Sequence, residues 1–207
     1  IGLEVLHGVD HSLDEGDVEG AGVVVVGLGH HPVDDVDLGG DEQKMVLAVE
    51  DLQLVAGATG GIGAALCQTV AERSPHISIV RLARDAGRLP RLGIQTHDVA
   101  CDIGDETSIA EAVCRIPKGL SLDWIMVATG WLHDSRWKPE KTFRDLDAAH
   151  LLHAYRINAV GPALLLKHLI PRLPKDSRST IGILSARVGS ISDNRLGGWH
   201  AYRASKA

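Results

Sequence analysis

Residues 52–63 read LQLVAGATGGIG, and this stretch decides the fold of the chain. The apolar run at 52–56 is typical of a short buried strand, and it leads directly into a loop with four glycines. Residues 64–73 then supply good helix formers. Glycines in such a loop allow a tight turn, a close approach of the backbone to a pyrophosphate, and close packing of helix against strand. Free N–H groups at the helix start would bind the phosphates, so the stretch predicts a dinucleotide site. Its candidate residues are Gly57, Thr59, Gly60, Gly61, Ile62 and Gly63.

Alternating apolar runs and helical stretches continue from this unit to the end of the chain. Strands are predicted at 77–82, 97–102, 122–128 and 180–184, and helices at about 105–113 and 147–170. The second helix contains Gly161-Pro162, which predicts a kink or a local break. Strands that alternate with helices in this way predict an α/β fold with a doubly wound parallel sheet of the Rossmann type.

The first 44 residues differ in kind from the rest. Residues 1–43 hold eleven Asp and Glu and no Lys or Arg, so the remaining residues hold all 21 basic side chains against 16 acidic ones. Only residues 22–29 look like a strand, and the Gly27-x-Gly29 that ends it is followed by a His-His-Pro run where a helix should open. We therefore expect an irregular acidic leader before a nucleotide-binding domain at 45–207. Either the leader is a poorly ordered native segment, or it lies outside the natural reading frame and Met45 is the start.

Several classes of protein are excluded by what the sequence lacks. No apolar run approaches the roughly 18 to 20 residues of a membrane helix, and no secretory signal opens the chain. Cys67, Cys101 and Cys114 are widely spaced, which argues against a disulfide framework or a metal site and predicts reduced, half-buried thiols. We expect a cytoplasmic protein that binds neither membranes, nucleic acid nor metal.

The end of the second strand bears on the choice of nicotinamide cofactor. An acid at this place would bind the ribose 2′-hydroxyl of NAD(H), whereas an arginine accommodates the 2′-phosphate of NADP(H). The strand continues as Arg81-Leu82-Ala83-Arg84, with Asp85 next. We assign Arg84 to the 2′-phosphate, which favours NADP(H) over NAD(H). The alternative is a solvated surface arginine, and the neighbouring Asp85 leaves the register open.

The motifs together resemble the short-chain dehydrogenase/reductase family over residues 52–207. The family's spaced glycines match Gly57, Gly61 and Gly63, and its acid after the third strand matches Asp102, which Ile103 follows. The sequences NAVGPA at 158–163 and LSARVGS at 184–190 are most similar to its bacterial C-factor-like subgroup. The resemblance implies further cofactor contacts at Asp102, Ile103, Ala128, Thr129, Gly130, Tyr202 and Lys206. It further implies a catalytic tetrad of Asn158, Ser185, Tyr202 and Lys206.

The tetrad predicts reduction of a carbonyl group or oxidation of a secondary alcohol. Tyr202 and Lys206 are four positions apart, so on a helix they share a face, and the ammonium can lower the tyrosine pKa from its usual value of about 10. Tyr202 then acts as general acid or base, and Ser185 binds the substrate oxygen while the nicotinamide supplies the hydride. By the resemblance, Asn158 holds a water in a proton relay and Lys206 also binds the nicotinamide ribose.

Departures from the family pattern qualify this prediction. Ala56 replaces a threonine, and Ala-Thr-Gly at 128–130 replaces Asn-Ala-Gly. Trp199, next to the catalytic helix, is either a substrate contact or a loop-packing residue.

The chain ends one residue after Lys206, so the resemblance implies that the family's last two strands are missing. We expect a marginally stable fragment with an exposed sheet edge, prone to association, whose full-length form is a homodimer or homotetramer. The alternative to an enzyme is an NAD(P)-binding signalling or regulatory protein without turnover, or an inactive fragment.

Overall fold

The computed structural model of the chain describes residues 2–8, 23–29, 52–118, 122–175, 177–192, 195 and 197–207. The strands are β1 (Gly2–Gly8), β2 (Val23–Gly29), β3 (Leu52–Ala56), β4 (Ser78–Ala83), β5 (Gln95–Ala100), β6 (Leu122–Val127) and β7 (Ser179–Leu184). The α-helices are α1 (Gly61–Arg73), α2 (Glu106–Arg115), α3 (Ala148–Tyr155), α4 (Gly161–Leu169) and α5 (His200–Lys206). Short helical turns are η1 (Ala86–Arg88), η2 (Phe143–Asp145), η4 (Ile170–Arg172) and η5 (Arg187–Gly189), and η3 (Arg156–Val160) is π-helical. None of the helices in the described part of the chain combines the length and the apolar composition that spanning a membrane requires.

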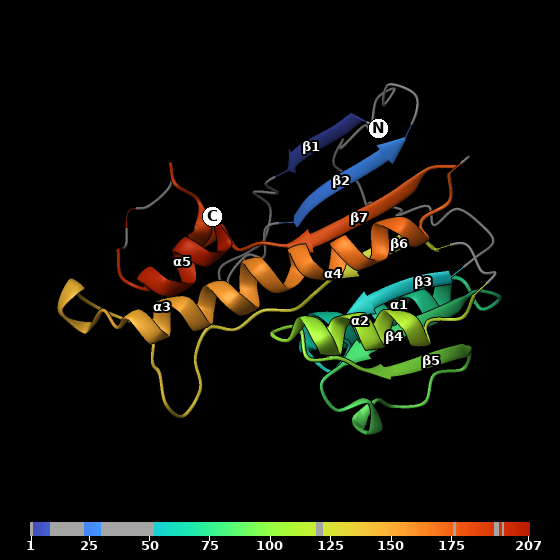
Figure 1. Ribbon diagram of the computed structural model, residues 1–207, viewed down its shortest axis with the longest axis horizontal. Helices are drawn as coiled ribbons and strands as arrows, with labels where there is room; N and C mark the ends of the chain where they lie inside the picture. The colour runs from blue at the N-terminus through green and yellow to red at the C-terminus, as the bar shows by residue number, and fades with distance from the viewer. Residues whose placement is uncertain are drawn as a thin grey trace.

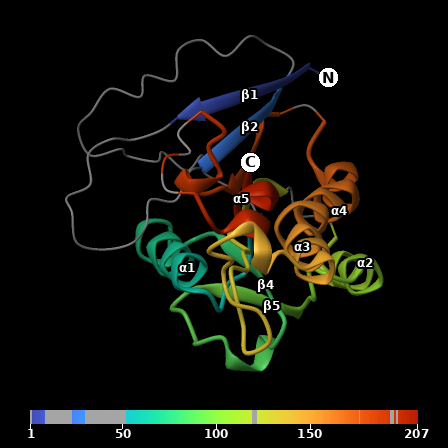
Figure 2. The same ribbon diagram turned by 90° about the vertical axis from the view of Figure 1, so that its left-hand side faces the viewer.

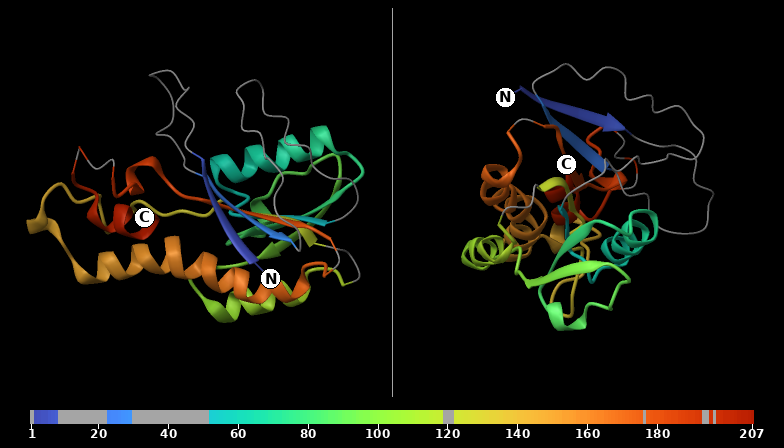
Figure 3. Two further views of the ribbon diagram at one scale, coloured as in Figure 1. Left: turned by 90° about the horizontal axis from the view of Figure 1, so that it is seen from above. Right: turned by 90° about the vertical axis from the view of Figure 1, so that its right-hand side faces the viewer.

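Five parallel strands form the centre of the molecule, in the order β7-β6-β3-β4-β5. Helix α1 covers one face of the sheet, and α2, α3 and α4 lie on the other (Figures 2 and 3). Side chains of β3 alternate between the two faces, because Leu54 packs with Leu165 in one hydrophobic core while Val55 packs with Val70 in the other. The predicted doubly wound α/β fold is therefore confirmed.

The long helix predicted at 147–170 is divided by the π-helical segment η3. In this segment the N–H of Gly161 donates to the carbonyl of Arg156, five residues earlier. Pro162 has no N–H to continue the regular ladder, which accounts for a break near the predicted position. A Cβ atom on Gly161 would lie 2.8 Å from Cγ1 of Ile103, so the glycine also lets this helix approach the loop after β5.

Two segments of the acidic leader are described as strands, and the expectation that the leader is irregular stays a prediction. The strand suggested at 22–29 is present as β2, but β1 was not anticipated. β2 pairs antiparallel with β7, with Val23 opposite Leu184, and β1 pairs with β2 at the edge of the sheet (Figure 1). The sheet edge expected to be exposed at β7 is therefore paired. Residues 9–22 and 30–51 lie outside the described residues, and the domain boundary at residue 44 stays a prediction.

The three cysteines are free in the structure, and the half-buried environment expected for them is found at none. Cys67 and Cys101 are buried, and burial raises the pKa of each thiol to about 11, whereas Cys114 is exposed. We expect a disulfide reagent such as Ellman's to modify one thiol quickly in the folded chain at mildly alkaline pH, because the thiolate is the reactive form. The Cys114→Ser variant should lose this fast phase, and fast reaction of two thiols would contradict the assignment.

Candidate active site

A pocket of about 320 Å³ lies at the carboxyl ends of β3, β6 and β7, where these strands point toward α5 (Figure 1). Parallel α/β sheets bind ligands at this edge, because the loops after the strands converge there. Nine predicted site residues line the pocket: Gly60, Gly61, Ile62, Ala128, Thr129, Gly130, Ser185, Tyr202 and Lys206. Trp131, Leu132, Leu184 and Ala186 also line it and were not predicted.

The glycine loop after β3 is shaped by close backbone contacts. Gly57 has a φ of 85°, and a Cβ atom there would lie 2.9 Å from the carbonyl oxygen of Ala128. The N–H groups of Gly57 and Ala58 both donate to the carbonyl of Leu82, at 2.8 and 3.1 Å, which joins the loop to the end of β4. Only glycine fits position 57 without strain, so the loop can lie directly against the residues that follow β6.

Helix α1 begins at this loop without a side chain that caps its N-terminus. Its N-cap residue is Gly60, no side chain accepts a hydrogen bond from the first turn, and no acidic residue lies there. The first N–H groups of a helix have no acceptor within the helix, and together with the helix dipole they favour an anion. The glycine loop and this helix end therefore fit the pyrophosphate of a dinucleotide.

Three charged residues at the end of β4, namely Arg81, Arg84 and Asp85, have different surroundings in the structure. Arg81 is buried and engaged, since it donates to both carboxylate oxygens of Asp98 at 2.7 Å and to the carbonyl of Pro90 at 2.7 Å. The carboxylate of Asp85 accepts the N–H of Gly87 at 3.1 Å and caps η1. Arg84 is exposed, and no side chain of the described residues pairs with it. Of the three, Arg84 has its charge available for a ligand.

Asp102 and Ile103 follow β5 and lie outside the pocket lining. The carboxylate of Asp102 accepts the N–H of Gly104 at 2.9 Å, while Ile103 is buried in the core. Asp102 is exposed, so its second oxygen can still accept a hydrogen bond from a ligand.

Asn158, in the π-helical segment η3, connects the loop after β6 to α5. Its Oδ1 accepts the N–H of Trp131 at 2.7 Å, and its Nδ2 donates to the carbonyl of Trp131 at 2.8 Å and to Oγ of Ser205 at 2.9 Å. Asn158 is buried and does not line the pocket. These hydrogen bonds show that Asn158 joins two segments of the fold. Its role in a proton relay stays a prediction.

Lys206 and Ser185 meet at the base of the pocket. The Lys206 ammonium donates to the carbonyl of Leu184 at 2.8 Å and to that of Thr129 at 3.3 Å. Burial lowers the pKa of Lys206 to about 8, so the side chain is still mostly charged at neutral pH. The Ser185 hydroxyl donates to the main-chain carbonyl of Lys206 at 2.6 Å. A hydroxyl can rotate, so Ser185 can donate to a substrate oxygen once that bond is broken.

Tyr202 lines the pocket one helical turn before Lys206, as its spacing predicted. Trp199 does not line the pocket and instead forms the N-cap of α5, with its ring 6.3 Å from that of Tyr202. Trp131 follows Gly130 directly in the sequence, so its position next to a predicted cofactor contact could have indicated that it lines the pocket.

Comparison with known proteins identifies relatives of residues 52–207. A family model of short chain dehydrogenases matches this range. The 1-hydroxy-2-glutathionyl-2-methyl-3-butene dehydrogenase of Rhodococcus sp. (strain AD45) is 30% identical over 155 residues, which cover 74% of this chain. The chain spans 64% of that relative's length. The C-signal protein of Myxococcus xanthus is 35% identical over 63 residues, or 30% of this chain and 38% of that protein, so similarity to the C-factor-like subgroup is limited to this part.

A crystal structure agrees with the architecture. The structure is of a Burkholderia multivorans protein described as a short-chain alcohol dehydrogenase. It superposes with a TM-score of 0.62 at 25% sequence identity, and the match covers 76% of this chain and 71% of that one.

Proposed function

The chain belongs to the short-chain dehydrogenase family, and we propose that it binds NADP(H) and acts between a carbonyl compound and a secondary alcohol. The observation that carries this proposal is the pocket in which Tyr202 and Lys206, one turn apart on α5, face the uncapped start of α1. The chain spans less than two thirds of its first relatives, so the activity of the whole protein is part of the proposal.

The cofactor would lie along the ends of β3, β4 and β6. N–H groups at the start of α1 would bind its pyrophosphate, and Arg84 its 2′-phosphate. The hydroxyl of Thr129, in the pocket wall, is buried and has no hydrogen-bond partner among the described residues. A buried hydroxyl without a partner is unfavourable, so a hydrogen-bonding group of the cofactor at this wall would stabilise it.

Residues on α5 and directly after β7 would transfer the proton and stabilise the charge. A bound NADPH would supply the hydride to the carbonyl carbon. Tyr202 gives its phenolic proton to the carbonyl oxygen, which becomes the alcohol hydroxyl. The Lys206 ammonium stabilises the phenolate left on Tyr202, and the Ser185 hydroxyl stabilises the negative charge as it grows on the substrate oxygen.

The cofactor preference can be tested at Arg84. A charge-assisted hydrogen bond to phosphate contributes about 1.5–3 kcal/mol, so Arg84→Ala should weaken NADPH binding by about 10- to 100-fold. NADH lacks the 2′-phosphate, and its affinity should change little. Fluorescence titration of both nucleotides would measure the two dissociation constants.

Arg73→Ala is the matched control, because Arg73 is an exposed arginine in the last turn of α1, far from the phosphate end of the helix. Equal weakening of NADPH and NADH by Arg84→Ala would contradict the assignment of Arg84. Absence of binding by both nucleotides to the unaltered chain would contradict the proposed function.

A further inference from the structure

The residue that precedes the first turn of α5, which carries Tyr202, is held in an unfavourable backbone conformation. Trp199 precedes the helix with a φ of 53°, and Gly197 and Gly198 before it have φ values of 63° and 67°. A residue with a Cβ is disfavoured in this left-handed region. The side chain of Trp199 does not cap the helix, so contacts from outside α5 must keep the first turn of α5 in place.

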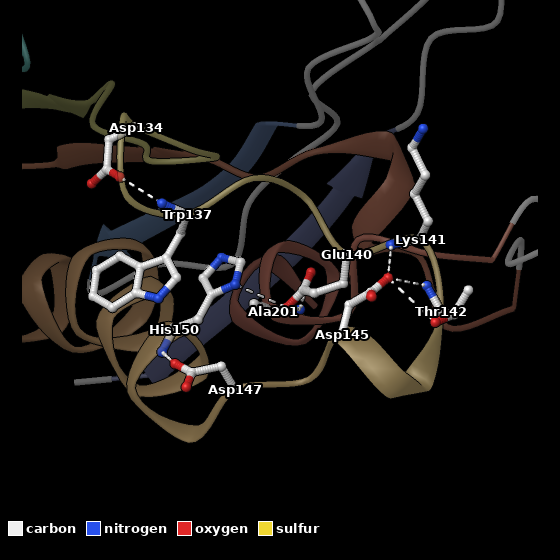
Figure 4. A network of polar contacts seen from close by, with 9 residues as sticks. All are labelled: Asp134, Trp137, Glu140, Lys141, Thr142, Asp145, Asp147, His150 and Ala201. Carbon is white, nitrogen blue, oxygen red and sulfur yellow. Dashed lines mark hydrogen bonds and ion pairs between the residues drawn. The ribbon is translucent and has the colours of Figure 1, made fainter.

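Glu140 provides these contacts from 61 positions earlier in the chain. Its main-chain carbonyl accepts the N–H of Trp199 at 2.6 Å, and its carboxylate oxygens accept the N–H of Ala201 at 3.2 and 3.4 Å. Figure 4 shows the side chain of Glu140 directed toward Ala201. A Cβ on Gly198 would lie 3.0 Å from the same Glu140 carbonyl oxygen, so the two segments are in direct contact. Glu140 therefore supplies the N-terminal cap that α5 lacks.

His150 also contacts the Glu140 carboxylate. Its Nδ1 lies 3.3 Å from Oε1 of Glu140, and both side chains are buried. The ring of Trp137 stacks on His150 with centroids 5.7 Å apart (Figure 4). The ring of Trp131 meets the His150 ring edge-on at 5.4 Å. A buried carboxylate is strongly destabilising without partners, so Glu140 is held where His150 and the Ala201 N–H both contact it.

Arg203 completes the support of the turn. Its guanidinium donates to the carbonyls of Gly198 at 2.9 Å, Val188 at 2.7 Å and Gly197 at 3.2 Å. Tyr202 thus lies between Ala201, which Glu140 holds, and Arg203.

We propose that Glu140 is a positioning residue for Tyr202: its buried carboxylate, held by His150, caps α5 and fixes the phenol against the pocket. The inference rests on the proposed function, in which Tyr202 is the proton donor. Glu140 touches neither the pocket nor a reacting atom, and it acts through the backbone of α5.

Glu140→Gln and Glu140→Leu form a matched pair of neutral variants. The glutamine oxygen can still accept hydrogen bonds from the Ala201 N–H and from Nδ1–H of His150, whereas leucine can accept neither. The chain contains two tyrosines, so isotope-labelled tyrosine gives two ring signals in the NMR spectrum of the full chain, which Tyr155→Phe assigns. Tyr155 is exposed on α3 and serves as the internal reference.

In Glu140→Leu we expect the Tyr202 signal to move toward that of a solvent-exposed tyrosine. Amide exchange at 199–206 should rise about tenfold, because a frayed first turn opens more often. In Glu140→Gln the Tyr202 signal and the amide exchange at 199–206 should stay close to those of the unaltered chain. The Tyr155 signal and the amide protection of β3 should change in neither variant. Should Glu140→Leu fail to fold, Ala201→Pro removes the same hydrogen bond from the helix side, where the first turn tolerates proline, and should move the Tyr202 signal alike.

An unmoved Tyr202 signal in Glu140→Leu or Ala201→Pro would overturn the inference. The inference would also be overturned if Glu140→Gln shifted the Tyr202 signal and reduced amide protection as much as Glu140→Leu does. Loss of amide protection in β3 would overturn it too, because either result would mean that Glu140 supports the fold in general.

A kinetic comparison separates this inference from the proposed function. Where the chain reduces a carbonyl probe, Glu140→Leu should lower kcat about tenfold without changing NADPH affinity, and should have no further effect in the Tyr202→Phe background. Additive losses in the double variant would overturn the inference. A chain without turnover would contradict the proposed function alone, because the tyrosine signals still report on Glu140.

Discussion

Tyr202→Phe is expected to lower NADPH-dependent carbonyl reduction by about 10²- to 10⁴-fold, the range that a positioned general acid contributes. The substitution removes only the phenolic oxygen, and Tyr202 is the one tyrosine in the pocket lining. Loss of NADPH absorbance with a panel of aldehydes and ketones would measure the effect. NADPH affinity should remain within about threefold, because the contacts proposed for the phosphates lie on α1 and Arg84.

Tyr155→Phe is the matched control, since Tyr155 is the other tyrosine, is 52% exposed and lies on α3 away from the pocket. This variant should keep full activity. Retained turnover in Tyr202→Phe would overturn the mechanism. NADPH binding without turnover in the unaltered chain would favour the alternative of a nucleotide-binding regulatory protein.

Gly63→Ala is expected to destabilise the chain by about 1–3 kcal/mol and to weaken NADPH binding more than tenfold, as overpacking at a rigid backbone does. An added Cβ would lie 2.8 Å from the carbonyl carbon of Gly57 and 3.2 Å from Cα of Ala58, and both are backbone atoms that cannot turn aside. Alanine is the better helix former by about 1 kcal/mol, so a net loss must come from this clash. Urea unfolding and nucleotide titration would measure the two effects.

Gly93→Ala is the control for this substitution, because a Cβ on Gly93 meets no atom within 4 Å and the residue lies outside the pocket lining. Its unfolding midpoint and nucleotide affinity should match those of the unaltered chain. If Gly63→Ala behaved like Gly93→Ala, the close packing of the glycine loop on α1 would not be needed for binding.

Local sequence determined most of the fold. The apolar run of β3, the glycine loop and α1 are contiguous, and each is specified by side-chain periodicity or by glycine at a turn that other residues cannot adopt. The same holds for Tyr202 and Lys206, since a spacing of four on a helix places both on one face. Arg84 and Asp85 are adjacent in the sequence, and their order alone left the cofactor preference open.

Only the tertiary structure decided features that depend on partners far away in the chain. The pairing of β2 with β7 joins segments about 155 residues apart through backbone groups, which carry little sequence pattern. Glu140 lies in an irregular loop, and nothing in its neighbours indicates that it caps α5. Asn158 was predicted from the family resemblance, yet its hydrogen bonds to Trp131 and Ser205 exist only in the folded chain.

The sequence by itself thus determined the βαβ units, the glycine loop and the spacing of the residues on α5, because these follow from rules that act over one or two turns of chain. The tertiary structure decided that Arg81 is bound to Asp98, that the Glu140 carboxylate caps α5 and that β2 pairs with β7. These depend on contacts between distant segments, whose geometry is set only when the whole core has packed.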